Sequence, residues 1–293
     1  MKYSYYPGCS AHASGREYNA SLRAVCQELD IELVEVPDWN CCGATAAAST
    51  RPQLAKALAA RNLAIAAEAK LDLMTPCSAC YKNIRGAALK LQEEAGARVE
   101  LEGLLGNRSL SHIPPVRHPV DILWNDVELS SLPVKRPLKG LKVASYYGCL
   151  ISRPKGGFDD PEAPRSMDDL MEAVGAEAVD WDFKTKCCGG AVFIPRKQIA
   201  LQLTGKILVK AHQAGADVIA VGCPFCHLLL DMYQDKALKQ VGADRDGRDA
   251  SDFRIPILYF SQLMGVALGI DDAPLELRGN VVSPFPVLKR IAR

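Results

Sequence analysis

The sequence predicts an α/β fold of two tandem homologous domains, each a small parallel sheet flanked by helices, related by a pseudo-twofold duplication. Three observations support this prediction. Short β-rich runs alternate with helical stretches, one pattern of cysteines occurs twice, and the 293 residues, 48% of them hydrophobic, can bury more than one core. We place the domains at residues 1–139 and 140–293.

The predicted strands have the same order in both halves. They cover residues 2–6, 31–36 and 71–75, and then residues 142–147, 177–181 and 217–222. Helical patterns fill the intervals, for example at 14–30 and 52–70. Strands that alternate with helices form parallel sheets, whose carboxyl ends meet at one edge, and α/β folds bind their ligands there.

Ten of the eleven cysteines follow a pattern that is written twice. The first copy reads C-x31-C-C-G-x33-C-x2-C and the second reads C-x37-C-C-G-x33-C-x2-C. The cysteines of the two copies are Cys9, Cys41, Cys42, Cys77 and Cys80, and Cys149, Cys187, Cys188, Cys223 and Cys226. Neighbouring segments correspond as well, since YYPGC matches YYGC and residues 112–123 match residues 254–265, which indicates a duplication.

Composition and charge exclude several classes of protein. The net charge of +1 gives no electrostatic reason to expect nucleic acid as a partner. No apolar run approaches the roughly 20 residues of a transmembrane segment, and the first residues lack the apolar region of a signal peptide. We therefore expect a cytoplasmic protein, in which an odd number of cysteines indicates metal or redox chemistry.

The two C-x2-C pairs are predicted to start helices just after a strand. Both thiols of a pair can then face one point, and the helix N–H groups favour their negative charge. Such a pair is typical of a zinc half-site, a thioredoxin-like dithiol or an iron–sulfur half-site.

The Cys-Cys-Gly triplets are more restrictive. Adjacent side chains of an extended backbone point to opposite faces, so the chain must bend sharply if both thiols are to reach one centre. Gly43 and Gly189 supply that freedom and let the backbone approach a bulky inorganic group. A vicinal disulfide is the alternative.

Five thiols in each half suit an open or irregular iron–sulfur cluster, because a tetrahedral zinc ion and a cubane cluster each take four. The alternative is a four-cysteine zinc site with one spare thiol, in a structural interaction module. Cys26 lies on the apolar face of a predicted helix and is interpreted as a small buried hydrophobe.

The doubled motif resembles the CCG-domain family, and most closely the HdrB-like proteins of heterodisulfide reductases, over nearly the whole chain. The stretches YYGCLISRP (146–154) and CPFCHLLLDMYQ (223–234) and the tail at 280–290 also resemble those proteins. The resemblance implies that the five cysteines of each copy hold a non-cubane [4Fe–4S] cluster. It also implies that the two clusters face one another, where a small-molecule or protein-bound disulfide is reduced or formed.

The resemblance also implies partners. The sequence carries neither a G-x-G-x-x-G fingerprint after the first strand of either half nor a ferredoxin-type cysteine run. Electrons would come from a ferredoxin-like (HdrC-like) iron–sulfur subunit and an HdrA-like flavin subunit. The alternative function is an electron-transfer or anchoring subunit of a respiratory complex of the succinate dehydrogenase type, without disulfide chemistry.

Several polar residues close to these cysteines are candidates for steering a substrate: His12, Arg153, Lys155, Lys184, Lys186 and His227. Arg and Lys suit a carboxylate or phosphate on the disulfide. His227 follows Cys226 directly, so we expect it to hydrogen-bond a cluster sulfur or deliver a proton. For each residue the alternative is an ordinary solvated charge or a packed histidine.

Overall fold

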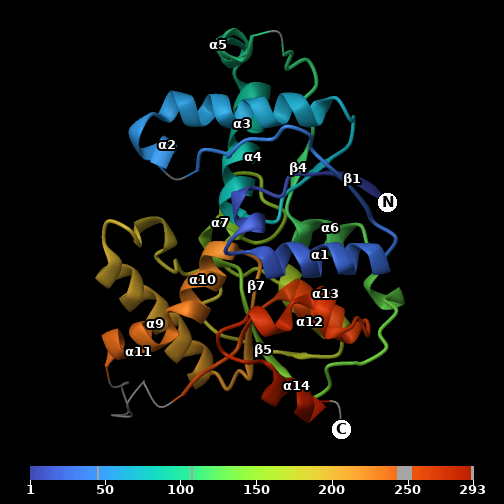
Figure 1. Ribbon diagram of the computed structural model, residues 1–293, viewed down its shortest axis with the longest axis vertical. Coiled ribbons are helices and arrows are strands. Elements are labelled where there is room, and N and C mark those ends of the chain that lie inside the picture. Colours follow the sequence, from blue (N-terminus) through green and yellow to red (C-terminus); the bar gives the residue numbers. More distant parts are fainter. Residues whose placement is uncertain (45, 107, 243–252, 292–293) are drawn as a thin grey trace.

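Each half of the chain folds around a four-stranded parallel sheet (Figure 1). The computed structural model describes residues 1–44, 46–106, 108–242 and 253–291. The first sheet has the order β2-β1-β3-β4 and the second the order β6-β5-β7-β8. The strands are β1 (Lys2–Tyr5), β2 (Glu32–Glu35), β3 (Leu73–Met74), β4 (Val116–Arg117), β5 (Lys142–Tyr146), β6 (Glu177–Ala178), β7 (Val218–Val221) and β8 (Ile257–Tyr259). The matching strand orders confirm the predicted α/β fold with two copies of one unit.

Helices connect the strands in both halves (Figure 1). Those of the first half are α1 (Arg16–Glu28), α2 (Ala46–Thr50), α3 (Pro52–Ala67), α4 (Ser78–Glu93), α5 (Ala95–Leu105) and α6 (Pro119–Asn125). Those of the second half are α7 (Gly148–Ser152), α8 (Ser166–Ala173), α9 (Lys197–Gln213), α10 (Pro224–Met232), α11 (Gln234–Val241), α12 (Phe260–Ala267), α13 (Asp272–Leu275) and α14 (Phe285–Ile291). The 3-10 turns are η1 (Cys9–His12), η2 (Leu129–Ser131), η3 (Gly190–Val192) and η5 (Leu277–Gly279). Within the described part of the chain, no helix has the length and hydropathy needed to cross a bilayer.

All six predicted strands are present, although β3 and β6 have only two residues each. The fourth strand of each sheet, β4 or β8, lies in a segment that the repeat had paired but that we had not predicted as a strand. Prolines bound β4 on both sides, at Pro115 and Pro119. Because proline has no N–H for the ladder, only two residues between them pair, and so short a run carries no periodic signal.

The predicted helices at 14–30 and 52–70 are α1 and α3. Pro52 is the first residue of α3, where its missing N–H costs nothing. On α1, Cys26 packs in the hydrophobic core with Leu22 and Val25 and is 1% exposed. Its interpretation as a small buried hydrophobe is confirmed.

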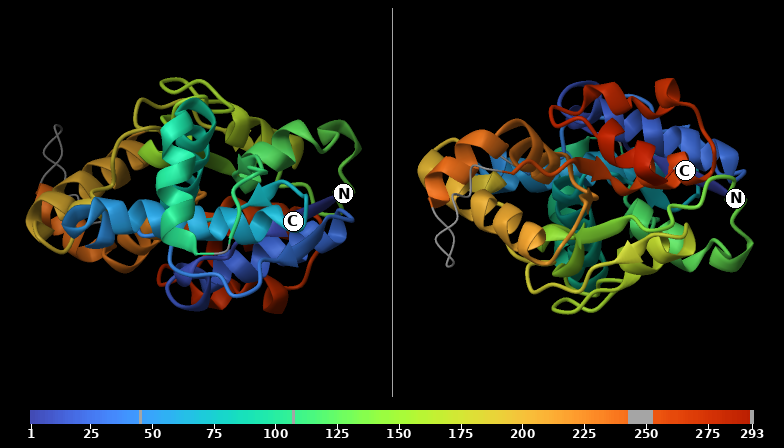
Figure 2. Two further views of the ribbon diagram at one scale, coloured as in Figure 1. Left: turned by 90° about the horizontal axis from the view of Figure 1, so that it is seen from above. Right: turned by 90° about the horizontal axis from the view of Figure 1, so that it is seen from below.

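One of the two hydrophobic clusters spans both halves, and the other lies within the first half. The ring of Tyr18 on α1 stacks on that of Tyr259, with centroids 4.4 Å apart, and Ser21 Oγ lies 2.7 Å from Ser261 Oγ on α12. All views show α1 beside the C-terminal helices (Figures 1 and 2). The duplicated units are therefore packed as one body, and the boundary at 139/140 stays a prediction.

Gly189 and Gly43 should contribute strongly to the stability of the fold. Gly189 has a φ of +87° and a Cβ there would lie 2.6 Å from Ala200 Cα, whereas a Cβ on Gly140, with φ +76°, meets nothing within 4 Å. We expect Gly189→Ala to lower the free energy of unfolding by about 2–4 kcal/mol, from backbone strain plus overpacking. Gly140→Ala carries the strain alone and should cost about 1 kcal/mol. Anaerobic urea unfolding measures both, and equal losses would show that the close approach contributes nothing.

Candidate functional site

The ten repeated cysteines lie just past the carboxyl ends of the strands, as predicted. Cys9 opens η1 after β1, and Cys77 and Cys223 are the residues immediately before α4 and α10. In the first half, Cys42 Sγ lies 3.3 Å from Cys80 Sγ. In the second half, Cys188 Sγ lies 3.5 Å from Cys226 Sγ. Both sheets therefore bring distant cysteines together at one edge.

The outer cysteines join the same groups. Burial raises the pKa of Cys9, and the neighbouring thiols Cys41, Cys77 and Cys42 raise it further when they are charged. The Cys149 thiol lowers the pKa of Cys187 to about 6, helped by the Gly189 N–H and the charge of Arg153 and opposed by burial. We call the two sets the first thiol group (Cys9, Cys41, Cys42, Cys77 and Cys80) and the second thiol group (Cys149, Cys187, Cys188, Cys223 and Cys226).

A buried tyrosine supports each thiol group from the same position of the repeat. Tyr6 donates a hydrogen bond of 2.8 Å to the carbonyl of Asn40, and Tyr146 donates one of 2.6 Å to the carbonyl of Lys186. Each of these carbonyls belongs to the residue just before a Cys-Cys pair. The two hydroxyls therefore fix where the bend of each pair begins.

The bend itself follows the prediction, with one difference. The N–H of Gly43 lies 3.4 Å from Cys41 Sγ, and that of Gly189 lies 3.3 Å from Cys187 Sγ. Both glycines have positive φ, but the atoms that would collide with a Cβ belong to Ala55 on α3 and Ala200 on α9. The glycines bring the bend against a helix, whereas their approach to an inorganic group stays a prediction.

The glycines next to Cys9 and Cys149 do approach the thiols. A Cβ on Gly8 would lie 3.1 Å from Cys80 Sγ, and one on Gly148 would lie 3.3 Å from Cys226 Sγ. Both have positive φ, at +70° and +64°. A side chain at either position would press on a cysteine sulfur, so the space beside these sulfurs depends on glycine.

The N-termini of α4 and α10 meet where the two halves join. Ser78 Oγ donates a hydrogen bond of 3.1 Å to the carbonyl of Gly222, next to Cys223. The Cys226 thiol lowers the pKa of Cys223, against burial, and the Ser78 hydroxyl contributes to the lowering. Because Ser78 follows Cys77 directly, this contact brings the two thiol groups close together across the junction.

Two further buried groups lie at this junction. His118 Nε2 lies 3.1 Å from the carbonyl of Gly222 and His118 Nδ1 accepts from the N–H of Val120, which makes Nε2 the donor. The stacked Tyr18 and Tyr259 have hydroxyls that are buried and have no hydrogen-bond partner among the described residues. Buried hydroxyls are normally partnered, so this pair is consistent with a missing polar or anionic group.

These observations allow a test of the implied clusters. All eleven cysteines are free thiols, so neither Cys-Cys pair forms a vicinal disulfide. Among the described residues, no three His, Cys, Asp or Glu side chains are arranged to hold a single metal ion. Each half nevertheless offers five soft thiols, and a glycine, Gly8 or Gly148, leaves room beside a sulfur that a side chain would fill. This donor set fits an iron–sulfur cluster, whose irons take thiolate ligands.

Most of the candidate steering residues have other partners. Arg153 pairs with Glu162 at 3.2 Å and Lys155 with Glu93 at 2.7 Å, both at the surface. The exposed His12 stacks on Trp39, and Lys186 is exposed beside Cys187.

His227 is buried and stacks on Tyr259, with centroids 4.3 Å apart. Its Nε2 lies 3.1 Å from the carbonyl of Ile257 and 3.1 Å from the side-chain nitrogen of Asn280. No bond joins it to a sulfur within the described part of the chain. His227 therefore packs against Tyr259 and fixes the position of that ring.

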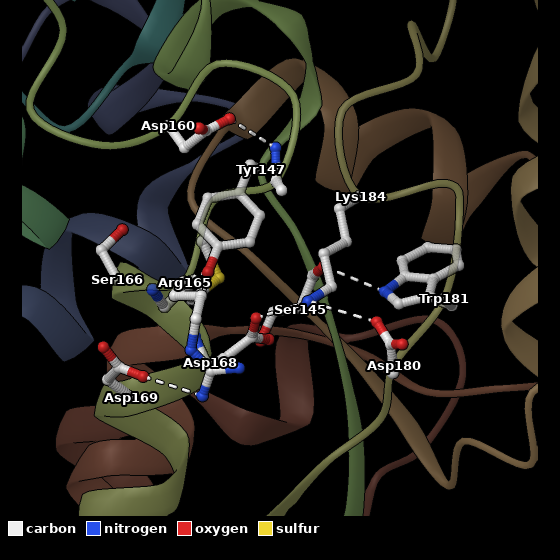
Figure 3. Close-up of polar contacts among 12 residues, drawn as sticks. Ser145, Tyr147, Asp160, Arg165, Ser166, Asp168, Asp169, Asp180, Trp181 and Lys184 are labelled. Atoms are coloured by element: carbon white, nitrogen blue, oxygen red, sulfur yellow. Dashed lines mark hydrogen bonds and ion pairs between the residues drawn. The ribbon is translucent and has the colours of Figure 1, made fainter.

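Lys184 is a structural residue (Figure 3). Its Nζ lies 2.6 Å from Oδ2 of Asp168, which is 1% exposed, and its carbonyl accepts from the N–H groups of Tyr147 and Gly148. Figure 3 shows the side chain between Asp168 and Asp180. The ion pair joins the segment before Cys187 to α8, and the Lys184 carbonyl joins it to the segment before Cys149, so Lys184 helps to assemble the second thiol group.

The sequence reading missed Ser78, His118, Tyr18 and Tyr259. A signal existed for two of them, because His118 and Tyr259 lie in the paired segments at 112–123 and 254–265. Each is the residue just before α6 or α12. Ser78 and Tyr18 had no such signal, since their roles depend on the contact between the halves.

The family comparison agrees with the repeated cysteine pattern. The cysteine-rich domain family CCG matches residues 3–85 and 143–231, one match in each half and more than half of the chain. The chain belongs to the CCG family. Full-length relatives of the HdrB type, from heterodisulfide reductases, place it among the HdrB-like members, as the doubled motif predicted.

Three curated relatives cover almost the entire chain. The 8-methylmenaquinol:fumarate reductase membrane anchor subunit of Wolinella succinogenes is 33% identical, over 96% of this chain and 97% of its own. An HdrB-like heterodisulfide reductase protein of Archaeoglobus profundus is 30% identical over 99% and 98%. The HdrB protein of the ferredoxin/F420H2-dependent CoB-CoM heterodisulfide reductase of Methanosarcina acetivorans is 29% identical over 99% and 97%.

A solved structure has the same fold. A hypothetical protein from Helicobacter pylori superposes with a TM-score of 0.76 at 13% identity, over 96% of this CCG-family chain. This chain spans about half (51%) of that protein. At this identity the similarity shows the fold alone.

The buried ion pair of Lys184 should stabilise the folded protein far more than an ion pair at the surface does. We expect Lys184→Met to lower the free energy of unfolding by about 3–5 kcal/mol, because it leaves Asp168 buried and uncompensated. Lys155→Met removes an exposed ion pair and should cost less than about 1 kcal/mol. The double variant Lys184→Met with Asp168→Leu should recover most of the loss. Thermal unfolding of the purified variants measures these differences, and similar losses for both single variants would contradict the assignment.

Proposed function

We propose that the chain is the catalytic iron–sulfur subunit of a cytoplasmic heterodisulfide reductase-like complex, which reduces or forms a disulfide between two facing non-cubane [4Fe–4S] clusters. The observation that carries the proposal is the pairing of two five-thiol groups across the Ser78–Gly222 contact. The first thiol group would hold one cluster and the second thiol group the other. Gly43 and Gly189 would shape the bends that carry the adjacent thiols.

The reaction consumes two electrons and two protons for each disulfide and yields two thiols. When bound, each cluster would supply one-electron redox chemistry and an iron able to take a thiolate sulfur. The protein would supply the fixed geometry. The contacts of Ser78 and His118 with Gly222 and the Tyr18–Tyr259 stack hold the halves together, so that a substrate meets both thiol groups at a constant separation.

The protein also excludes water from the inner side of both groups. Cys77, Cys80, Cys223 and Cys226 are each no more than 7% exposed, whereas Cys9, Cys41 and Cys187 are exposed. Electrostatic interactions are stronger in such a partly dry site. Electrons would come from a ferredoxin-like iron–sulfur subunit and a flavin subunit. The relatives named as subunits of heterodisulfide reductases support a place within a larger complex.

A second function is favoured by the relative of 33% identity, which is named as a subunit of a quinol:fumarate reductase. The chain would then carry electrons within a respiratory complex without acting on a disulfide. Both functions use the same ligands, so cluster content alone does not separate them.

Iron and acid-labile sulfide should be present in the anaerobically purified protein. We expect about eight irons for each chain, and about half of that for Cys188→Ser, which removes a ligand of one cluster only. Cys26→Ala is the matched control, because Cys26 lies in the core away from both groups and its loss should leave the iron unchanged. Stoichiometric zinc without sulfide, or an unaltered iron content in Cys188→Ser, would contradict the ligand assignment.

Disulfide-dependent turnover should separate the two functions. We expect the loaded wild-type protein to oxidise reduced methyl viologen when small thiol-derived disulfides are added, and Cys188→Ser to lose this activity while it keeps half of the iron. Spectrophotometric oxidation of the dye measures the rate. A protein that holds both clusters and is inert toward every disulfide and persulfide would favour the electron-transfer function.

A further inference from the structure

An exposed apolar loop follows the second Cys-Cys-Gly triplet. Nine large hydrophobic side chains of the described residues are exposed, and three of them lie in residues 190–199. Val192 is 38% exposed, Ile194 94% and Ile199 50%. Cys187, a member of the second thiol group, is exposed just before this loop. Apolar side chains gathered at one place on a surface mark an interaction site more often than scattered ones do.

The loop is held in a defined conformation. The N–H of Val192 bonds the carbonyl of Gly189 at 3.0 Å, and the N–H of Arg196 bonds the carbonyl of Val192 at 2.8 Å. The ring of Phe193 packs edge-on against Tyr233, with centroids 4.7 Å apart. Ile194 is therefore presented to solvent by an ordered turn with an anchored neighbour.

The first half provides an internal reference for this surface. Gly43 approaches Ala55 just as Gly189 approaches Ala200, so the segment after Gly43 is equivalent to the loop at 190–199. In that segment Leu54, at 45%, is the only exposed large hydrophobic among the described residues, and it is the counterpart of Ile199. The two surfaces are equivalent in the duplication, but among the described residues only the one in the second half has a cluster of exposed apolar side chains.

The stretch of chain that contains the loop carries only basic charges. No Asp or Glu occurs between Phe183 and Ala216. Lys186, Arg196 and Lys197 are exposed, and none of them forms an ion pair with a carboxylate of the described part. Lys197 Nζ lies 5.8 Å and 5.7 Å from the ring centroids of Phe193 and Tyr233, so its charge is positioned beside the apolar residues.

We propose that residues 190–199, together with Lys186, form the docking surface for an acidic electron-transfer protein that delivers electrons to the second thiol group. The inference rests on the proposed function only in that the second thiol group holds a redox centre. Positive charges steer an acidic partner, and the exposed isoleucines supply the apolar contact at the centre of the interface. Cys187 is exposed and follows Lys186 directly, so a partner that contacts Lys186 would approach the second thiol group.

The experiment measures reduction of the loaded protein by a small acidic bacterial ferredoxin that carries two cubane clusters. Stopped-flow absorbance gives the second-order rate constant, without any disulfide present. We expect Ile194→Asp to lower this rate constant by about tenfold or more, and Arg196→Glu with Lys197→Glu to lower it and remove most of its salt dependence. Ile194→Gln checks that the effect does not need a new charge.

The control is Leu54→Asp, the same change at the position equivalent to Ile199 in the first half. Its rate constant should equal that of the wild type, and all variants should keep their iron content and their reduction by methyl viologen.

Equal losses of the rate constant for Leu54→Asp and Ile194→Asp would overturn the proposal, and so would unchanged rate constants in every variant. It would also be overturned if the rate constant of the wild-type protein did not depend on salt concentration. A change of oligomeric state in Ile194→Asp by sedimentation would also overturn it, since the loop would then contact a second copy of the chain. Failure of the proposed disulfide chemistry would leave these rate constants unaffected, so the two outcomes are distinguishable.

Discussion

The close contact between each Cys-Cys-Gly bend and the helix that follows it sets the position of the adjacent thiols. A Cβ on Gly43 or Gly189 would lie 2.9 or 2.6 Å from the Cα of Ala55 or Ala200, so the bend rests directly on α3 or α9. Neighbouring side chains then satisfy the carbonyls of the bend. Asn83 donates to the carbonyl of Cys42 at 2.7 Å and Thr204 to that of Cys188 at 2.9 Å. Because the backbone polar groups have partners in the protein, the thiols are left available for a ligand.

The second constraint is the junction between the halves. Two separate domains joined by a linker would let the distance between their thiol groups vary, whereas the shared core and the Ser78–Gly222 bond fix it. The two sulfurs of a disulfide are only about 2 Å apart, so a site that handles both ends of that bond depends on a constant separation. A protein that only carries electrons tolerates more variation, which is why the rigidity of the junction bears on the choice between the two functions.

The features that could be predicted from the sequence are those written in local patterns. The cysteine spacing located the strand ends, the helical face of α1 placed Cys26 in the core, and the repeat paired the segments that contain β4 and β8. The features that could not be predicted depend on burial. Lys184 reads as a loop charge until Asp168, sixteen residues earlier, is found buried against it. His227 follows a cysteine, yet its Nε2 faces the carbonyl of Ile257 and its ring stacks on Tyr259, which in turn stacks on Tyr18.

The two halves of the duplicated scaffold differ in the surroundings of their thiol groups. The residue three positions before the first cysteine of each pair is Asp38 in one half and Lys184 in the other. Asp38 is exposed, with a left-handed φ of +48°, and pairs with Arg61 at the surface, whereas Lys184 is inserted into the protein against Asp168. The buried pair stiffens the segment that precedes Cys187, and the ordered loop with Ile194 follows it. A rigid support on one side of an exposed cysteine and an apolar, basic surface on the other are what a docking site needs, and neither has a counterpart at Cys41. These unequal surfaces around two similar thiol groups are the basis for the proposed entry of electrons at the second group.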